Sequence, residues 1–186
     1  MEVFSSEAKA SHWLKQGNIL IHPTEGVWGI GCDAFNSKAV KRVYEIKKRA
    51  LNKSLIIVCN NIDIMQDYLM PYDSHDVDEI LKITKGPVTI LYPYSKERLP
   101  EHLQNDTGKL AIRVSAHYPL KSLLEEFNNS IVSTSANISS RETLQDIEAI
   151  KEIFPHEDVA LFNKELGSLN KPTPIIDLIS KEILRQ

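Results

Sequence analysis

Short apolar runs recur along this chain, and they constrain its fold more than any other feature of the sequence. The clearest is residues 54–59 (SLIIVC), which is too short for a buried helix and rich in β-branched side chains, so it favours a buried strand. Similar runs predict strands over residues 18–22, 27–32, 88–92, 110–114, 130–133, 159–162, 175–178 and 183–185.

Segments of helical length separate many of these strands. Residues 5–16 are predicted to form a helix that Gly17 ends, and Asn36 or Ser37 can cap a helix that runs to about residue 48. Further helices are expected at residues 62–69, 77–84, 120–127 and 144–154. Because helices and strands interleave while several strands follow one another directly, the pattern predicts an α/β fold with a mixed parallel and antiparallel sheet.

The overall composition is that of an ordinary globular protein. The 186 residues are 42% hydrophobic and 25% charged, so we expect a single domain over residues 1–186. Lys plus Arg total 22 against 25 Asp plus Glu, and the net charge of −3 gives no hint of nucleic-acid binding, although a local basic patch stays open. Cys32 and Cys59 lack metal-ligand spacing and are expected to be reduced, buried thiols.

The first 16 residues lack the apolar core of a signal peptide. No run approaches the roughly 20 apolar residues of a membrane-spanning helix. We therefore expect a cytoplasmic protein with no membrane partner.

Basic residues are concentrated in the second predicted helix and the loop after it. Between residues 38 and 53 there is a single acid, Glu45, among seven basic residues: Lys38, Lys41, Arg42, Lys47, Lys48, Arg49 and Lys53. Positions 40, 43, 44 and 47 share one stripe of a helix, so Lys47 is expected to point toward the body of the protein. Lys41 and Lys48 are expected to face solvent.

This basic stretch has two interpretations. Charge runs usually form a solvated helix face. Alternatively, because no acid lies near Lys47 in sequence, a bound anion is a natural counter-charge, and Arg49 and Lys53 could close on the same phosphate or carboxylate. The residues alone leave both interpretations open.

Residues 131–140 (IVSTSANISS) form a second signal. An apolar strand runs into small or hydrogen-bonding residues at positions 133–137, which let a ligand approach the backbone and offer it hydroxyl and amide groups. The alternative is an ordinary strand-to-helix turn with polar capping. Ser135 lacks the G-x-S-x-G context of a nucleophilic serine.

Residues 21–33 (IHPTEGVWGIGCD) form a third, weaker signal. Three glycines and a proline allow a tight backbone path between two strands, but neither a Walker A nor a G-x-G-x-x-G pattern is present. The six histidines are scattered without paired spacing, so no protein metal site is predicted.

Taken in order, these segments resemble the YrdC-type threonylcarbamoyl-AMP synthase family. The matching stretches are PTE (23–25), GIGCDA (29–34), YEIKKR (44–49) with the later Lys53, GPVT (86–89), AIRV (111–114), TSAN (134–137), and PTPIID (172–177) ahead of ILR (183–185). They span nearly the whole chain in the family's order. The resemblance implies a YrdC-like single domain with a twisted mixed sheet flanked by helices, and the length matches the short bacterial form.

The resemblance also implies a reaction. Threonine and bicarbonate form a carbamate, which attacks the α-phosphate of ATP and releases pyrophosphate. The product, L-threonylcarbamoyladenylate, passes to the tRNA threonylcarbamoyl transferase complex, which modifies the adenosine next to the anticodon. Such a nucleotidyl transfer depends on positioning and charge neutralisation rather than on a covalent nucleophile, and Mg²⁺ is expected to arrive with ATP.

Site residues follow from the same register. The family's KxR element falls on Lys47 and Arg49, which are implied to be catalytic, and its SxN element falls on Ser135 and Asn137. The resemblance further implies a set of ligand contacts: ATP at Lys47, Arg49, Lys53, Ser135, Asn137 and Arg185, and threonine at Thr24, Arg113, Ser133 and Thr173.

Two other functions stay open at this point. A binding module could hold double-stranded RNA or tRNA on a concave basic surface, although the net charge and the absence of stacking aromatics among the basic residues argue against it. A hydrolase or carbamoyl transferase could use the same scaffold, but the zinc-finger and acylphosphatase-like segments of such larger enzymes are absent.

Overall fold

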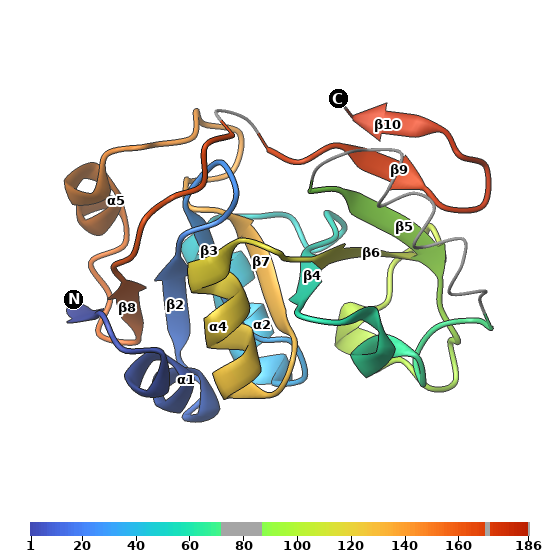
Figure 1. The fold of residues 1–186 in the computed structure, drawn as a ribbon, viewed down its shortest axis with the longest axis horizontal. Coiled ribbons are helices and arrows are strands. Elements are labelled where there is room, and N and C mark those ends of the chain that lie inside the picture. The colour runs from blue at the N-terminus through green and yellow to red at the C-terminus, as the bar shows by residue number, and fades with distance from the viewer. Residues whose placement is uncertain (72–86, 170–171, 186) are drawn as a thin grey trace.

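The computed structural model describes residues 1–71, 87–169 and 172–185, and the strands there form one ten-stranded sheet. The strand order is β1-β8-β2-β3-β7-β4-β6-β5-β9-β10 (Figure 1). The strands are β1 (Glu2–Phe4), β2 (Ile19–His22), β3 (Gly29–Asp33), β4 (Ile56–Cys59), β5 (Thr89–Pro93), β6 (Lys109–Val114), β7 (Ile131–Ser135), β8 (Val159–Phe162), β9 (Ile175–Asp177) and β10 (Ile183–Arg185).

The sheet is mixed, which confirms the fold class expected from the sequence. Both β1 and β2 run parallel to β8 between them, and the pairs β4–β6 and β5–β9 are also parallel. The remaining neighbours pair antiparallel, including β2–β3 and β3–β7.

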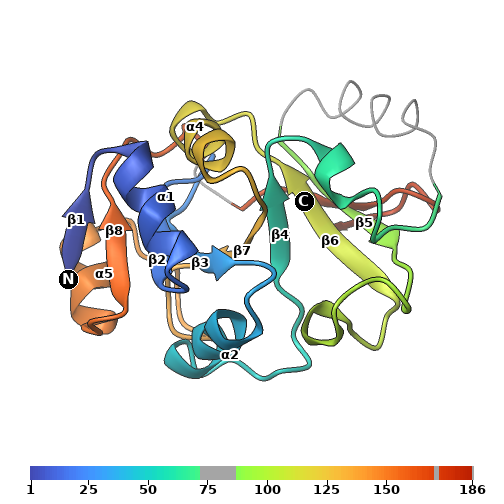
Figure 2. The same cartoon turned by 90° about the horizontal axis from the view of Figure 1, so that it is seen from below.

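Helices cover both faces of this sheet. They are α1 (Glu7–Lys15), α2 (Ser37–Ile46), α4 (Tyr118–Phe127) and α5 (Ile147–Ile153), with short 3₁₀ helices η1 (Ile62–Met65) and η2 (Glu101–Leu103). Figure 2 shows α4 and α2 on opposite sides of the sheet, and α1 packs alongside α4. None of the helices in the described part of the chain combines the length and the apolar character needed to cross a bilayer.

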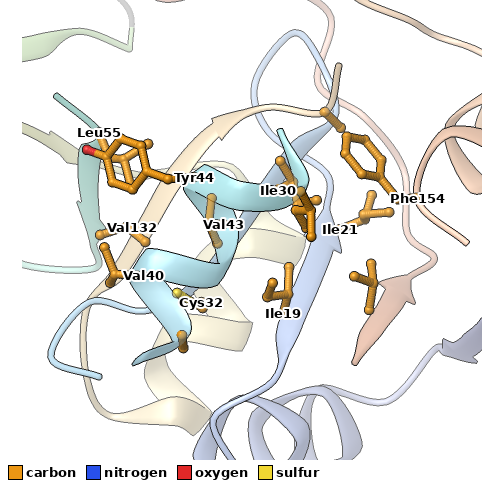
Figure 3. Packing of buried hydrophobic residues seen from close by; sticks show 14 of the residues in the cluster. Ile19, Ile21, Ile30, Cys32, Val40, Val43, Tyr44, Leu55, Val132 and Phe154 are labelled. Carbon is orange, nitrogen blue, oxygen red and sulfur yellow. The ribbon is translucent and has the colours of Figure 1, made fainter. Parts of the chain in front are cut away.

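The helix α2 matters most for the site, because the basic stretch follows it directly. The Asn36 side chain caps the helix by accepting a hydrogen bond from the backbone N–H of Ala39 at 3.1 Å. Val40, Val43 and Tyr44 form its buried stripe. Figure 3 shows the two valines near Cys32 of β3 and Val132 of β7, and Tyr44 beside Leu55. This packing fixes where the chain leaves the helix, and therefore where Lys47 and the residues after it lie.

Most expected elements are present, and their bounds shift by a few residues. The helix expected over 62–69 is shorter, because only Ile62–Met65 forms a 3₁₀ helix before Leu69 makes a bridge to Tyr94. The sequence pattern did not predict β1 or η2. The helix expected over residues 77–84 lies outside the described residues.

Candidate functional site

One cavity of about 390 Å³ brings together six of the ten expected site residues, and it lies where strands from the middle of the sheet meet the C-terminal hairpin β9–β10. The six are Thr24, Arg49, Arg113, Ser133, Ser135 and Arg185. A larger cavity of about 480 Å³ between α2 and η2 contains none of the ten, so we take the first as the candidate site.

Three arginines from distant parts of the chain give this cavity its charge. Arg49 follows α2, Arg113 lies on β6 and Arg185 lies on β10. Burial lowers the pKa of each guanidinium, although Glu25 opposes this effect at Arg113. Because a guanidinium stays protonated in proteins, the cavity concentrates positive charge and suits a ligand with phosphate or carboxylate groups.

Backbone carbonyls orient two of these arginines. The Arg49 guanidinium donates to the carbonyl oxygens of Lys53 at 3.2 Å and Ser54 at 2.7 Å. Arg185 donates twice to the carbonyl oxygen of Thr173, at 3.1 and 2.6 Å. A carbonyl group is neutral, so these contacts fix the direction of each side chain without cancelling its charge.

Arg113 instead has a carboxylate beside it. Its Nη1 lies 3.4 Å from Oε2 of Glu25, and both side chains are only 7% exposed. Ser115 donates a hydrogen bond to the other carboxylate oxygen, Oε1, at 2.6 Å. Two buried polar atoms of this pair, Arg113 Nε and Glu25 Oε2, have no hydrogen-bond partner among the residues that the structure describes. A buried pair that is incompletely satisfied marks a place where a polar ligand can complete the hydrogen bonding.

Thr24 organises the loop between β2 and β3. Its hydroxyl donates to the carbonyl oxygen of Val27 at 2.6 Å and accepts from the backbone N–H groups of Gly26 and Val27, at 3.4 and 3.3 Å. This turn delays the start of β3 until Gly29, two residues later than the apolar pattern suggests. The Thr24 hydroxyl is therefore engaged by its own loop, although the residue lines the cavity.

Ser133 enters the cavity from β7 and contacts a buried histidine. Its Oγ lies 3.2 Å from Nε2 of His22, which is the last residue of β2. The Nδ1 atom of His22 lies 3.2 Å from the carbonyl oxygen of Pro23. None of His22, Glu25 and Ser115 was predicted to be a site residue. His22 and Glu25 lie within residues 21–33, which stood out for their glycines and proline, and Glu25 is also part of the matched PTE stretch, while Ser115 carried no signal.

Lys47 is buried, as the helical stripe predicts, but its partners are unexpected. It is 1% exposed, and its ammonium donates to the backbone carbonyl oxygens of Ser135 and Asn137, at 2.5 Å each. Burial, with a contribution from Arg49, lowers the pKa of Lys47 to about 7. The sequence suggested a bound anion as the counter-charge of Lys47, whereas in the structure two carbonyl oxygens accept hydrogen bonds from its ammonium group. Lys47 does not line the cavity.

The Ser135–Asn137 turn is held by its own side chains as well. The Ser135 hydroxyl donates to Oδ1 of Asn137 at 2.5 Å, and the Asn137 amide donates to the carbonyl oxygens of Ile138 and Arg141. The buried side chain of His22 contacts Ser133 and not Ser135. A hydroxyl that donates to an amide oxygen has no base to activate it, so this arrangement suits ligand binding better than nucleophilic attack.

The remaining expected site residues lie next to the cavity without lining it. Lys53 is exposed on the loop after Arg49. Thr173 is 2% exposed, and its hydroxyl shares a hydrogen bond of 2.9 Å with Thr89. Lys41 is exposed, as expected for the solvated face of α2.

The two cysteines are free and buried, as expected. Burial raises the pKa of both thiols, to about 12 for Cys59. Both therefore stay protonated at neutral pH and are poor nucleophiles.

Comparisons with known proteins agree with this architecture. The Sua5/YciO/YrdC family model, which is described as telomere recombination, matches residues 12–186. The threonylcarbamoyl-AMP synthase of Coxiella burnetii (strain RSA 493 / Nine Mile phase I) is 34% identical over 172 residues, which cover 92% of each chain.

Two solved structures share the fold. P. abyssi Sua5 complexed with L-threonine has a TM-score of 0.80 and 25% identity, with 92% of this chain and 50% of that chain covered. This chain therefore spans about half the length of that protein. E. coli YciO has a TM-score of 0.79 and 23% identity, with 97% and 88% covered. The match of the family model over nearly the whole sequence shows that this chain belongs to the Sua5/YciO/YrdC family.

Proposed function

We propose that this protein is a threonylcarbamoyl-AMP synthase, a nucleotidyltransferase that makes L-threonylcarbamoyladenylate and pyrophosphate from L-threonine, bicarbonate and ATP. Relatives that are 31–35% identical over most of their length carry this name. The observation that carries the proposal is the cavity itself, which is lined by three arginines and by three consecutive residues of β7, Ser133, Thr134 and Ser135. That lining is matched to a ligand pair rich in anionic oxygens.

We propose a division of labour among the arginines. Arg113, which lies beside Glu25 and lines the same cavity as Thr24, takes the carboxylate of threonine. Arg49 and Arg185 take phosphate oxygens of ATP, and the exposed Lys53 closes on them when the nucleotide binds. Support comes from the position of the three guanidinium groups on one cavity, where each can form charge-assisted hydrogen bonds.

The other expected residues then act through the ones that line the cavity. Lys47 and Asn137 hold the turn that presents Ser135 to the ligand. Thr173 orients Arg185 through its carbonyl oxygen. In this proposal the catalytic contribution of Lys47 is to keep the turn in place, while Arg49 contacts the reacting phosphate.

The chemistry itself requires little from the protein beyond positioning. A carbamate oxygen of N-carboxythreonine forms a bond to the α-phosphorus of ATP, and the bond from that phosphorus to the bridging oxygen breaks. The electron pair of that bond leaves with pyrophosphate, whose charge the arginines stabilise. Holding the two reactants in line within one cavity supplies most of the acceleration.

Mg²⁺ is part of the proposal as a companion of ATP. No group of three His, Cys, Asp or Glu side chains able to hold a metal ion was found among the described residues. Phosphate oxygens are the hard ligands that Mg²⁺ prefers, and it commonly binds through substrate phosphates. When bound there, the ion would neutralise phosphate charge, and Arg49 and Arg185 would orient the same phosphates.

We further propose that the product passes to the tRNA threonylcarbamoyl transferase complex and that the protein works in the cytoplasm. The names of the relatives support the synthase and not the RNA-binding alternative. Direct contact with tRNA is therefore no part of the proposed reaction.

The test is to incubate the purified protein with ATP, L-threonine and bicarbonate, and to measure pyrophosphate together with the mass of the adenylate. Product and pyrophosphate should require all three substrates, and L-serine should replace threonine poorly. Equal pyrophosphate release with serine, with threonine or without an amino acid would refute the proposal. An RNA-binding protein would instead show affinity for RNA that falls steeply with salt.

A further inference from the structure

His22 is a buried residue that the proposed reaction does not use. Its side chain is fully enclosed at the end of β2, with Nδ1 3.2 Å from the carbonyl oxygen of Pro23 and Nε2 3.2 Å from Oγ of Ser133. A carbonyl oxygen can only accept a hydrogen bond, so Nδ1 must carry the ring proton. The Nε2 atom of the neutral ring is then an acceptor.

The ring is neutral at physiological pH. Burial lowers the pKa of His22 to about 4, and the nearby Arg113 adds to this shift while the Pro23 carbonyl and Glu25 oppose it. With Nε2 as an acceptor, the single hydrogen of the Ser133 hydroxyl is donated to the ring. Ser133 lines the cavity, so what it presents to a ligand there is a pair of oxygen lone pairs and no hydrogen.

The contact between His22 and Ser133 spans an intervening strand. The two residues lie on β2 and β7, which flank β3 in the sheet, and His22 is directly opposite Gly29. A Cβ atom at Gly29 would lie 2.5 Å from Cε1 of His22 and 3.0 Å from Oγ of Ser133. The absence of a side chain at position 29 therefore leaves the space in which the imidazole reaches the serine.

We propose that His22 is a positioning residue that fixes the Ser133 hydroxyl as a hydrogen-bond acceptor for an N–H or O–H group of the amino-acid substrate. The inference rests on the proposed function, because it concerns the binding of the amino acid. Carboxylate and phosphate oxygens are themselves acceptors, so an acceptor-only hydroxyl disfavours them at this point. These groups are left to the arginines, and the amino acid is oriented with its donor groups toward β7.

The proton arrangement can be tested in the unaltered protein. In ¹⁵N-histidine NMR spectra, Nδ1 of His22 should show the protonated, pyrrole-type shift and Nε2 the unprotonated, pyridine-type shift from pH 6 to pH 8. The signal is assigned by its loss in His22→Phe or, if that variant does not fold, in His22→Leu. The opposite tautomer, or a charged ring in this range, would overturn the inference without any measurement of activity.

The consequence for binding is tested with His22→Phe, which keeps an aromatic ring but removes the acceptor. Losing one oriented hydrogen bond should weaken threonine binding and raise its KM by about tenfold, while the KM for ATP changes less than about twofold. His12→Phe, at an exposed histidine of α1, is the matched control and should leave both values unchanged. A parallel rise in the KM values for threonine and ATP would indicate a purely structural role and would overturn the inference.

A double-mutant cycle separates positioning from general damage. Ser133→Ala should weaken threonine binding, and adding His22→Phe should cause little further loss, because the hydroxyl that His22 orients is already absent. Fully additive losses would overturn the inference. If the unaltered protein makes no threonine-dependent pyrophosphate, the proposed function fails; if it is active and His22→Phe binds threonine normally, only this inference fails.

Discussion

Replacing Lys47 with methionine tests whether this lysine supports the Ser135–Asn137 turn or acts on ATP directly. Methionine has a similar length and removes the ammonium group. The substitution withdraws both hydrogen bonds that Lys47 donates to the carbonyl oxygens of Ser135 and Asn137. If support of the turn is its role, the variant should lose stability as well as activity.

The expected loss of stability can be worked from these contacts. The Ser135 carbonyl keeps a second donor, the backbone N–H of Asn137 at 2.9 Å, so the cost falls mainly on the Asn137 carbonyl. A buried carbonyl that loses its donor costs about 1–3 kcal/mol. Burial of the ammonium group is itself unfavourable, as the lowered pKa of Lys47 of about 7 indicates. The methionine variant avoids this unfavourable burial, which offsets part of the cost. We therefore expect the free energy of unfolding to fall by about 1–2 kcal/mol. Activity should fall at least tenfold, because the turn that loses these hydrogen bonds is the one that positions Ser135 at the cavity.

The assay is urea unfolding of the ligand-free protein, together with pyrophosphate release. Lys41→Met is the matched control, since Lys41 lies on the exposed face of the same helix, and it should change stability by less than about 0.5 kcal/mol. Full stability of Lys47→Met combined with lost activity would refute the reasoning. Lys47 would then act on the nucleotide and not on the turn.

Four further predictions follow from the same site. Arg49→Ala should lower activity at least tenfold and leave the fold intact, because it removes a charged hydrogen bond worth about 1.5–3 kcal/mol, whereas Lys41→Ala should be nearly silent in the same pyrophosphate assay. Ser135→Ala should lower activity several-fold to about a hundredfold, and intact-protein mass spectrometry should detect no covalent adduct at Ser135 in the unaltered protein during turnover; an adenylyl or acyl adduct there would contradict direct attack. Glu25→Gln should lower the free energy of unfolding by about 3 kcal/mol in denaturant titrations, because it leaves a buried guanidinium without its carboxylate, and an unchanged midpoint would contradict this. Between pH 7 and pH 9 the free energy of unfolding of the unaltered protein should rise relative to that of Lys47→Met by up to about 1.4 kcal/mol per pH unit. The pKa of Lys47 in the folded protein, about 7, lies below its value in the unfolded chain. The unfolded chain therefore binds more protons in this window, and stability rises with pH.

Local patterns were sufficient for most of the fold. The bounds of β8 and β10 agree with the sequence prediction, and Asn36 caps α2 as expected. The pattern missed β1 because a run of three residues has no periodicity of its own; it is a strand only through its pairing with β8, far away in sequence. The pattern also predicted a longer helix than η1. Local composition allows a helix through Leu69, but Leu69 instead forms a bridge with Tyr94, which is also distant in sequence.

The candidate site was harder to predict, because it depends on sheet order. Helical periodicity alone indicated that Lys47 is buried. The basic stretch already indicated Arg49, while Arg113 and Arg185 were indicated only by the family resemblance. The contact between His22 and Ser133 requires that β3 lie between their strands and carry a glycine there, which no local pattern encodes. The hydrogen bonds from Lys47 to the carbonyl oxygens of Ser135 and Asn137 were equally unpredictable, because they join residues that are distant in sequence.

The residues that line the cavity are spread along the sequence from Thr24 to Arg185. Ligand binding therefore requires that nearly the whole chain has folded. Contacts between residues so far apart in sequence form only when the complete sheet has assembled, so folding is expected to be slower than for a protein rich in local contacts. A ligand that binds only the assembled cavity stabilises every strand that contributes to it, by about 2.7 kcal/mol at a concentration of 100 times its Kd. Thermal shifts produced by ATP, threonine or their analogues would therefore measure occupancy of the site and integrity of the sheet in a single experiment, even where turnover is too slow to detect.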